Sequence, residues 1–162
     1  MAQSPLRPTD DEARALAHEL LRAARYASLA TLTEAGHPMQ SRIAFGLDGA
    51  GQPISLVSTL AAHTQAVRTR PQISLLVGEP GDKGDPLTHP RLTLNGRGEI
   101  LPNTGERHAE MAAHYLRSHP KAKLYIGFGD FHFLRFHITD GFLNGGFGKA
   151  FQMTQADLFQ VG

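Results

Sequence analysis

The sequence predicts a small antiparallel β-barrel, of mainly β or α+β class, with six to seven strands and two to three helices at its margins. The chain has 17 glycines and ten prolines among its 162 residues, and such a content is typical of a fold with many turns. Short segments with strand-like patterns recur along most of the chain. They are not separated by regularly alternating full-length helices, which argues against a doubly wound parallel sheet.

An amphipathic helix is expected over residues 9–25. Thr9 and Glu12 have the spacing of a capping box, in which the two side chains bond the first free amides of a helix. Apolar residues then recur at helical spacing. They are Ala13, Leu16, Ala17, Leu20, Leu21 and Ala24.

The barrel is expected over residues 27–151 and begins with three strands joined by hairpins. The turn at 48–51, Asp-Gly-Ala-Gly, is a strong hairpin signal. Strands linked in this way form an antiparallel meander, so the second and third should lie side by side. The three expected strands are Ala27–Thr33, Gln40–Leu47 and Pro53–Ser58.

A helical turn over 62–70 follows, and the remaining strands complete the barrel. The apolar run Ile73–Val77 is expected to be buried on both faces, and the stretch from Gly78 to Pro90 is a loop by composition. Asp140-Gly141 is expected to separate the last two strands. The later strands are Ile73–Val77, Arg91–Leu101, Phe131–Thr139 and Phe142–Phe151.

A second full helix is predicted over 104–118, inserted in the barrel, with Met111 and Tyr115 in its apolar stripe. A tail over 152–162 follows the barrel, and a short helix is expected to begin in it at Thr154. The chain is long enough for one domain with a single core, so residues 1–162 are assigned to one domain.

Composition excludes several classes of function. The chain has no cysteine, which excludes disulfides, thiolate zinc sites and cysteine nucleophiles. A formal net charge of +1 gives no bulk attraction to nucleic acid. No apolar run approaches the roughly 18 residues of a membrane span, and the N-terminus lacks the pattern of a signal peptide. We therefore expect a cytoplasmic protein with no nucleic-acid or membrane partner.

Motifs for nucleotide, hydrolase and metal chemistry are missing. The glycines near 127–129 and 145–148 lack the strand–turn–helix context of a dinucleotide site. The spacing of His108, His114 and His119 does not stack them on one helix face, so no metal site is predicted. Glu99, Glu106 and Glu110 have no evident acid–base partner and are interpreted as solvated charges. No catalytic acid or base is assigned from the sequence.

The segment from Ser58 to Pro71 is the strongest candidate for a ligand site. A strand delivers Ser58 and Thr59 to the start of a helical turn, where free amides and the helix dipole favour an anion. The alternative is a simple helix cap with solvated arginines. Arg42 favours the ligand site over the simple cap. It lies on the face of its strand opposite Ile43, so its guanidinium can approach the turn and clamp a phosphate.

The order of several motifs resembles a known family. The chain carries, in order, A-T-L-T-E-A-G-H-P, S-R-I-A-F, I-S-L-V-S-T-L-A-A-H-T, R-x-R-P-Q-I-S-L-L-V and P-R-L-T-L-N-G-R. This order is similar to the FMN-binding split β-barrel of pyridoxamine-5′-phosphate-oxidase-like proteins. H-T-Q-A-V, G-F-G-D-F and G-G-F-G-K-A resemble its haem-utilisation (HugZ-type) branch. The resemblance covers about residues 12–151.

The resemblance implies a homodimer with two FMN sites at the subunit interface. By this resemblance Arg42 and the backbone of Ile43–Phe45 would lie along the flavin and its phosphate. Ser58 and Thr59 would face the pyrimidine side of the ring or the ribityl chain. His63 and Thr64 would take the phosphate position, where the oxidases carry Ser-Arg-Lys. Arg91 would contribute near the dimer interface. The cofactor-binding residues implied are Arg42, Ile43, Ala44, Phe45, Ser58, Thr59, His63, Thr64 and Arg91.

Three functions follow from the resemblance. The first is an FMN-binding flavoprotein, an oxidoreductase acting on an unknown small substrate. The second is a haem-binding or haem-degrading protein of iron utilisation, although the tail lacks the histidine that haem-binding members use and offers only Met153 as a soft ligand. The third is a non-enzymatic flavin-binding module. Residues that bind pyridoxamine phosphate have no clear counterpart, so oxidation of vitamin B6 is not expected.

Overall fold

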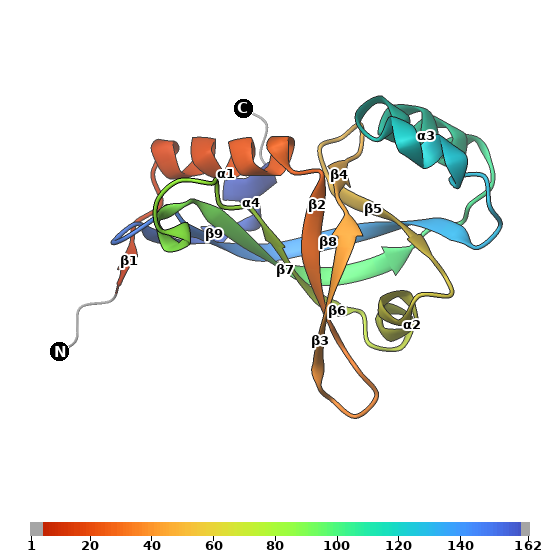
Figure 1. Ribbon diagram of the computed structural model, residues 1–162, viewed down its shortest axis with the longest axis horizontal. Helices are drawn as coiled ribbons and strands as arrows, with labels where there is room; N and C mark the ends of the chain where they lie inside the picture. Colours follow the sequence, from red (N-terminus) through yellow and green to blue (C-terminus); the bar gives the residue numbers. More distant parts are fainter. Residues whose placement is uncertain (1–4, 160–162) are drawn as a thin grey trace.

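The computed structural model describes residues 5–159 and confirms the predicted fold class. A nine-stranded, mostly antiparallel sheet curls into a split barrel, and helices lie at its ends and on one side (Figure 1). The first four residues, and residues 160–162 of the expected tail, lie outside the described range. None of the described helices is long and apolar enough to cross a membrane.

The main path of the sheet runs in the order β1-β9-β8-β7-β6-β2-β3, and β5 adds to β8 and carries β4 on its side. Every pair is antiparallel except β1 with β9, which is parallel. The strands are β1 (Leu6–Arg7), β2 (Tyr26–Leu32), β3 (Pro38–Ala44), β4 (Gly46–Leu47), β5 (Pro53–Ser58), β6 (Gln72–Val77), β7 (Arg91–Ile100), β8 (Phe131–Asn144) and β9 (Ala150–Thr154).

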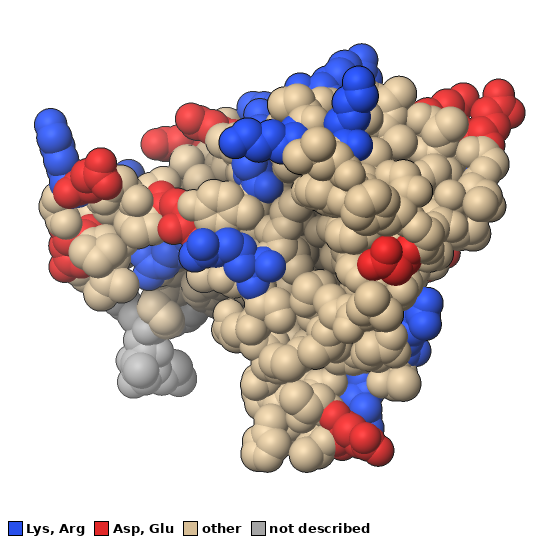
Figure 2. Space-filling view, turned by 45° about the vertical axis from the view of Figure 1, so that its right-hand side comes forward, with Lys and Arg blue, Asp and Glu red and all other residues tan. Residues whose placement is uncertain are grey.

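The helices cover different parts of the barrel. In Figure 1, α1 lies at the upper left, α2 at the lower right and α3 at the upper right. Between α3 and the β2–β3 hairpin the molecule is hollowed and mostly uncharged (Figure 2). The helices are α1 (Asp11–Ala23), α2 (Ala62–Thr69), α3 (Glu106–Ser118) and α4 (Gln155–Phe159), with short 3-10 turns at Pro86–Thr88 and Pro120–Leu124.

Two apolar clusters hold the fold together. The larger fills the barrel, and α1 contributes Ala17 and Leu21 to it because these residues share one helix face. The smaller lies between the outer side of β5 and β8 and helix α3, where Tyr115 packs edge-on against Phe133 at 5.4 Å. Met111 and Tyr115 are buried, as the expected apolar stripe requires. Strands β5 and β8 are therefore covered on both sides.

The expected meander is wrong at one point: β3 and β5 do not pair. In the described sheet β3 pairs with β2 alone, while β4 pairs with β5. The chain changes direction at Phe45, whose side chain is fully buried and whose N–H donates to the Arg25 carbonyl at 2.9 Å. The predicted strand Gln40–Leu47 is thereby divided into β3 and β4. The edges of β3 and β5 diverge, and we call the opening between them the seam.

The start of α1 also differs from the expectation. Asp10, not Thr9, is the N-cap, and its side chain accepts a hydrogen bond from the Ala13 N–H at 2.8 Å. The Thr9 hydroxyl instead donates to the Gln152 carbonyl at 2.9 Å, which links this end of the helix to β9. The carboxylate of Asp10 is favoured there because the N-terminus is the positive end of a helix. At its other end, α1 stops at Ala23 rather than at residue 25.

Asp140-Gly141 does not form a turn, because β8 continues through it to Asn144. The Asp140 carboxylate accepts from the Asn95 side-chain amide at 2.9 Å and stays in the ladder with β7. A register shift next to Asn95 and Gly96 leaves Thr139 as the extra residue of a bulge. The reversal into β9 occurs instead at residues 145–149, where the Gly145 N–H donates to the Lys149 carbonyl.

Strand β6 is buried on one face rather than two. Leu75 is 1% exposed, but Leu76 on the opposite face is 45% exposed. Leu76 lies in a row across neighbouring strands that none of the described helices covers, and we call this row the outer face. It runs Arg42, Ser28, Leu76, Thr93, Phe142 and Gln152, from β3 to β9.

Candidate functional site

Within residues 5–159 the seam presents two strand edges without a neighbouring strand, that of β3 and that of β5 beyond Ile54. Gly46 pairs with Ile54 and Leu47 with Pro53, and the same register continued along the chain would set Arg42 opposite Ser58. The strands have parted before that point. An edge strand directs alternate N–H and C=O groups outward, so both sides of the seam offer backbone donors and acceptors to a ligand.

Arg42 lies at the β3 side of the seam with an exposed side chain. Its guanidinium carbon is 5.6 Å from the centre of the Tyr26 ring, a cation–π distance. In the described part of the chain it forms no ion pair with a carboxylate. The guanidinium is thus held by the ring while its donors stay free for an anion. Of the neighbouring predicted residues, Ile43 and Phe45 bury their side chains in the barrel, and the Phe45 N–H is bonded to the Arg25 carbonyl on the β2 side. Because hydrogen-bonded positions alternate along a strand, the Ala44 backbone is the one that faces the seam.

Ser58 and Thr59 build the turn at the end of β5. The Ser58 hydroxyl donates to the Asp130 carboxylate at 2.5 Å and accepts from the Leu60 N–H at 3.1 Å. The Thr59 N–H donates to the Asp130 carbonyl at 2.8 Å. Asp130, inside the G-F-G-D-F motif, was not singled out from the sequence, and it fixes this turn from 72 residues away. Ser58 is therefore committed to the scaffold, whereas Thr59 has no described hydroxyl partner.

Helix α2 begins without a side-chain cap. Its N-cap residue is Ala61, whose carbonyl accepts from the N–H groups of Thr64 and Gln65, both at 3.1 Å. The first N–H groups of a helix have no partner within it, so an uncapped start favours an anion. Thr64 is fully buried, and its hydroxyl has no partner among the described residues. The helix start thus offers N–H groups rather than the Thr64 side chain.

His63 is half-buried at this helix start. Burial lowers the pKa of its imidazole below the ordinary value of 6.5, because a charged ring is poorly solvated there. The ring is therefore neutral at pH 7. It can donate or accept a hydrogen bond, but it does not supply the fixed cation that a lysine would.

Arg91 lies apart from the other candidates. Its guanidinium donates to the carbonyls of Leu87 at 2.8 Å and His89 at 3.3 Å, which holds the loop before β7. Strand β7 is three strands from β3, about 14 Å across the sheet. Arg91 does not reach the seam of its own chain. The structure thus places Arg42 on the β3 side of the seam and Ser58, Thr59 and His63 at the end of β5 and the start of α2 on its other side, and it leaves Arg91 outside.

The histidines of α3 and its flanks have structural contacts. His114 bonds the Leu47 carbonyl at 3.0 Å, and His119 bonds the Arg25 carbonyl at 3.1 Å and stacks on Tyr115. Glu99, expected to be a solvated charge, pairs with His137 at 2.6 Å, and both are about half exposed. Within residues 5–159 there is no group of three or more histidine or acidic side chains placed to hold a metal ion.

The family model described as pyridoxamine 5'-phosphate oxidase matches residues 13–145. The chain belongs to the pyridoxamine 5'-phosphate oxidase family. That match covers most of the barrel, including both sides of the seam, and it confirms the resemblance inferred from the motifs. A solved structure that is 44% identical superposes with a TM-score of 0.86, over 96% of this chain and 100% of the other.

Other relatives within or near the pyridoxamine 5'-phosphate oxidase family carry haem in their names. The chloroplastic non-canonical heme oxygenase HOZ of Arabidopsis thaliana is 38% identical over 101 residues, 62% of this chain and 29% of that protein. A structure of a heme binding protein from Mycobacterium smegmatis is 29% identical, with a TM-score of 0.81, and covers 94% of this chain and 61% of the other. The chain therefore spans less than two thirds of both proteins.

Proposed function

We propose that this protein is a single FMN-binding split-barrel domain that serves as a flavin-dependent oxidoreductase for a small substrate. The observation that carries the proposal is the seam. Its two open strand edges lie between the free guanidinium of Arg42 and the uncapped start of α2. A long ligand with an anion at one end and a polar ring at the other matches such an opening.

The residues at the seam fit FMN. Arg42, the first N–H groups of α2 and the neutral ring of His63 would hold the phosphate, and the Thr59 hydroxyl would bond the ribityl chain. Of the stretch Ile43–Phe45, the backbone groups of Ala44 would bond the polar edge of the ring, since the Phe45 N–H is bonded to Arg25 on the β2 side. Bound FMN supplies hydride and electron transfer, while the chain binds and orients it. With Arg42 as the one side-chain cation in this set, we expect micromolar affinity, about 8 kcal/mol.

A first prediction concerns the FMN affinity. Titration with FMN should give saturable flavin absorbance and quenched flavin fluorescence, and Arg42→Met should weaken binding about tenfold to a hundredfold. This range follows from the loss of charge-assisted hydrogen bonds, each worth about 1.5–3 kcal/mol. Arg70→Met is the matched control, because Arg70 ends α2 and bonds the Glu34 carbonyl away from these groups. No saturable binding, or equal affinity of both variants, would contradict the proposal.

Haem is the second candidate ligand, favoured by the two haem-related relatives. Its propionates would take the same anion position at Arg42, and His63 is the imidazole available at the seam. Met153 is fully buried in the barrel, so it does not offer its sulfur to a ligand. A haem titration of the same protein separates the candidates. A Soret shift that His63→Ala abolishes, without saturable FMN binding, would favour haem.

We also propose that the protein is a homodimer that pairs through the outer face. Leu76 and Tyr26 there are 45% and 42% exposed, and small side chains such as Ser28 and Thr93 leave the surface flat. Arg91 lies on the same side of the sheet as Arg42, so it is placed to approach the seam of a partner chain. Exposed large apolar side chains on a sheet face that none of the described helices covers favour association there.

The mass of the protein, measured by sedimentation, tests this second prediction of a homodimer. Two chains of 17.6 kDa give a mass of about 35 kDa, and Leu76→Glu should convert the protein to a monomer by burying a charge in the interface. Leu87→Glu is the control, since Leu87 is 56% exposed in the loop before β7. A monomeric parent protein, or a dimer unaffected by Leu76→Glu, would show that the outer face is not the interface.

A further inference from the structure

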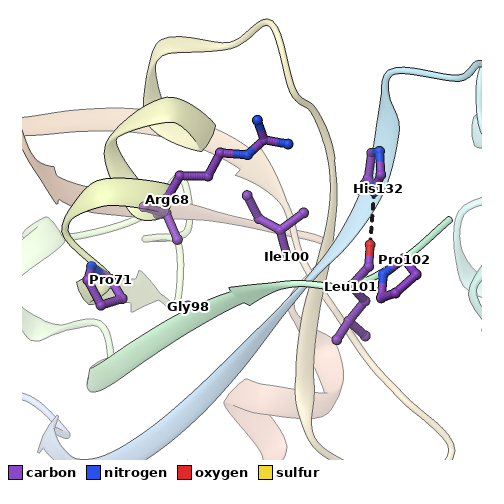
Figure 3. Close-up of a pocket in the computed structure, with 8 residues that line it drawn as sticks. Arg68, Pro71, Gly98, Ile100, Leu101, Pro102 and His132 are labelled. Carbon is purple, nitrogen blue, oxygen red and sulfur yellow. Dashed lines mark hydrogen bonds between the residues drawn. The ribbon is translucent and has the colours of Figure 1, made fainter.

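A groove of about 490 Å³ lies between α2 and the adjoining ends of β7 and β8, apart from the seam residues (Figure 3). This volume is within the range of small-molecule sites, about 300–1,000 Å³. The groove contains one arginine, one histidine and an otherwise mainly apolar lining. Its lining residues are Val67, Arg68, Pro71, Gly98, Ile100, Leu101, Pro102 and His132.

The floor of the groove is rigid and apolar. Ile100 forms its centre, with Pro71 and Pro102 to either side in Figure 3. A Cβ atom at Gly98 would lie 2.8 Å from the side chain of Val67, so the glycine lets α2 approach β7 closely. The Gly98 N–H donates to the Pro71 carbonyl at 2.8 Å, which fixes the end of α2 against the strand. A flat apolar group can lie on this floor without reordering it.

His132 presents a defined hydrogen-bond acceptor. Its Nδ1 is 2.9 Å from the Leu101 carbonyl oxygen. A carbonyl only accepts, so Nδ1 carries the hydrogen, and in the neutral form of the ring Nε2 then keeps a lone pair that no described residue uses. Figure 3 shows the bonded side of the ring facing Leu101 and its other side turned away. The hydrogen bond to Leu101 thus fixes the orientation of the imidazole and turns its Nε2 away from that carbonyl.

Arg68 supplies the charge. Its side chain reaches from α2 over Ile100, towards the wall that carries His132 (Figure 3). It is exposed and forms no ion pair or hydrogen bond with another described residue. The nearest acidic residue along β7, Glu99, is paired with His137 on the other face of that strand. A guanidinium with free donors is suited to bidentate recognition of a carboxylate.

We propose that this groove binds a small hydroxylated aromatic carboxylic acid. The carboxylate pairs with Arg68, the ring lies on Ile100 between the two prolines, and the hydroxyl donates to Nε2 of His132. The two polar contacts at opposite walls select a ligand that carries both groups. None of the groove residues belongs to the seam set, and we therefore expect the groove to bind its ligand whether or not a cofactor is bound at the seam.

The probe for this site is 4-hydroxybenzoate, titrated into isotope-labelled full-length protein and followed by NMR. We expect saturable shifts of the Gly98, Ile100 and Leu101 amides. Benzoate, which lacks the hydroxyl, and 4-hydroxybenzamide, which lacks the charge, should each bind about tenfold more weakly, the change that 1.4 kcal/mol produces. Adding FMN should leave the groove shifts in place.

Variants make the test specific. Arg68→Met should weaken 4-hydroxybenzoate about tenfold or more. Arg97→Met is the control, since Arg97 is exposed on β7 but does not line the groove. His132→Gln should remove the preference for 4-hydroxybenzoate over benzoate. Absence of saturable groove shifts up to roughly 10 mM, shifts confined to the seam, or unchanged affinity of Arg68→Met would each overturn the proposal.

Discussion

Replacing Asp48 by alanine is expected to lower the free energy of unfolding by about 3 kcal/mol or more. The carboxylate is 6% exposed and pairs with Arg135 at 2.8 Å through Oδ2. Its Oδ1 accepts from the N–H groups of Ala50 and Gln52, both at 2.9 Å. Alanine would leave the largely buried guanidinium without a counter-charge and the β4–β5 turn without its acceptor. A loss of this size is a large part of a typical stability of about 5–15 kcal/mol.

Urea unfolding of the Asp48 variants measures this effect, and thermal unfolding should shift by about 6 °C or more. Asp48→Asn keeps an acceptor for the turn but removes the charge, so its loss should be smaller. Glu99→Gln is the control, since that residue pairs with His137 at half-exposed positions and should cost about 1 kcal/mol or less. If Asp48→Ala is no more destabilising than Glu99→Gln, the buried pair does not stabilise the hairpin.

Replacing Gly96 by alanine should lower the free energy of unfolding by about 2 kcal/mol or more, because the added methyl group forces two strands apart. A Cβ atom at this position would lie 2.1 Å from the His137 carbonyl oxygen and 2.9 Å from the Ile138 Cα. Both neighbours are backbone atoms within the β7–β8 ladder, so no side-chain rotation relieves the clash. The bulge next to Asn95 and Gly96 therefore depends on the missing side chain.

The comparison for Gly96→Ala is Gly127→Ala, where a Cβ atom would meet nothing within 4 Å. The two substitutions add the same methyl group, and neither glycine has the positive backbone φ that disfavours alanine. Urea unfolding should show little change for Gly127→Ala and a markedly lower midpoint for Gly96→Ala. Equal midpoints would mean that the bulge relaxes around an added methyl group.

Much of the fold was predictable because strand and helix patterns are local. Pro53–Ser58 was predicted with the bounds that the structure shows, and the apolar stripe of α3 was identified by its period. The error at Asp140-Gly141 has a physical cause. A turn signal is a short-range preference, and here a cross-strand bond from Asn95 and a bulge outweigh it.

The candidate site was predictable only in part. The residue types and order around Ser58 and His63 indicated an anion site, and Arg42 was placed on the correct face of its strand. The hydrogen bonds that organise the site join residues that are far apart in the sequence. Asp130 fixes the turn at Ser58 across 72 residues, and no local pattern specifies that partner. Arg135 likewise reaches Asp48 across 87 residues.

The sequence by itself determined the barrel class and the family, because these depend on periodicity and motif order. Only the tertiary structure decided that β3 and β5 part at Phe45 to open a seam. It also decided that Thr64 is buried and that Arg91 is about 14 Å away across the sheet. Pairing, burial and distance result from the packing of the whole chain.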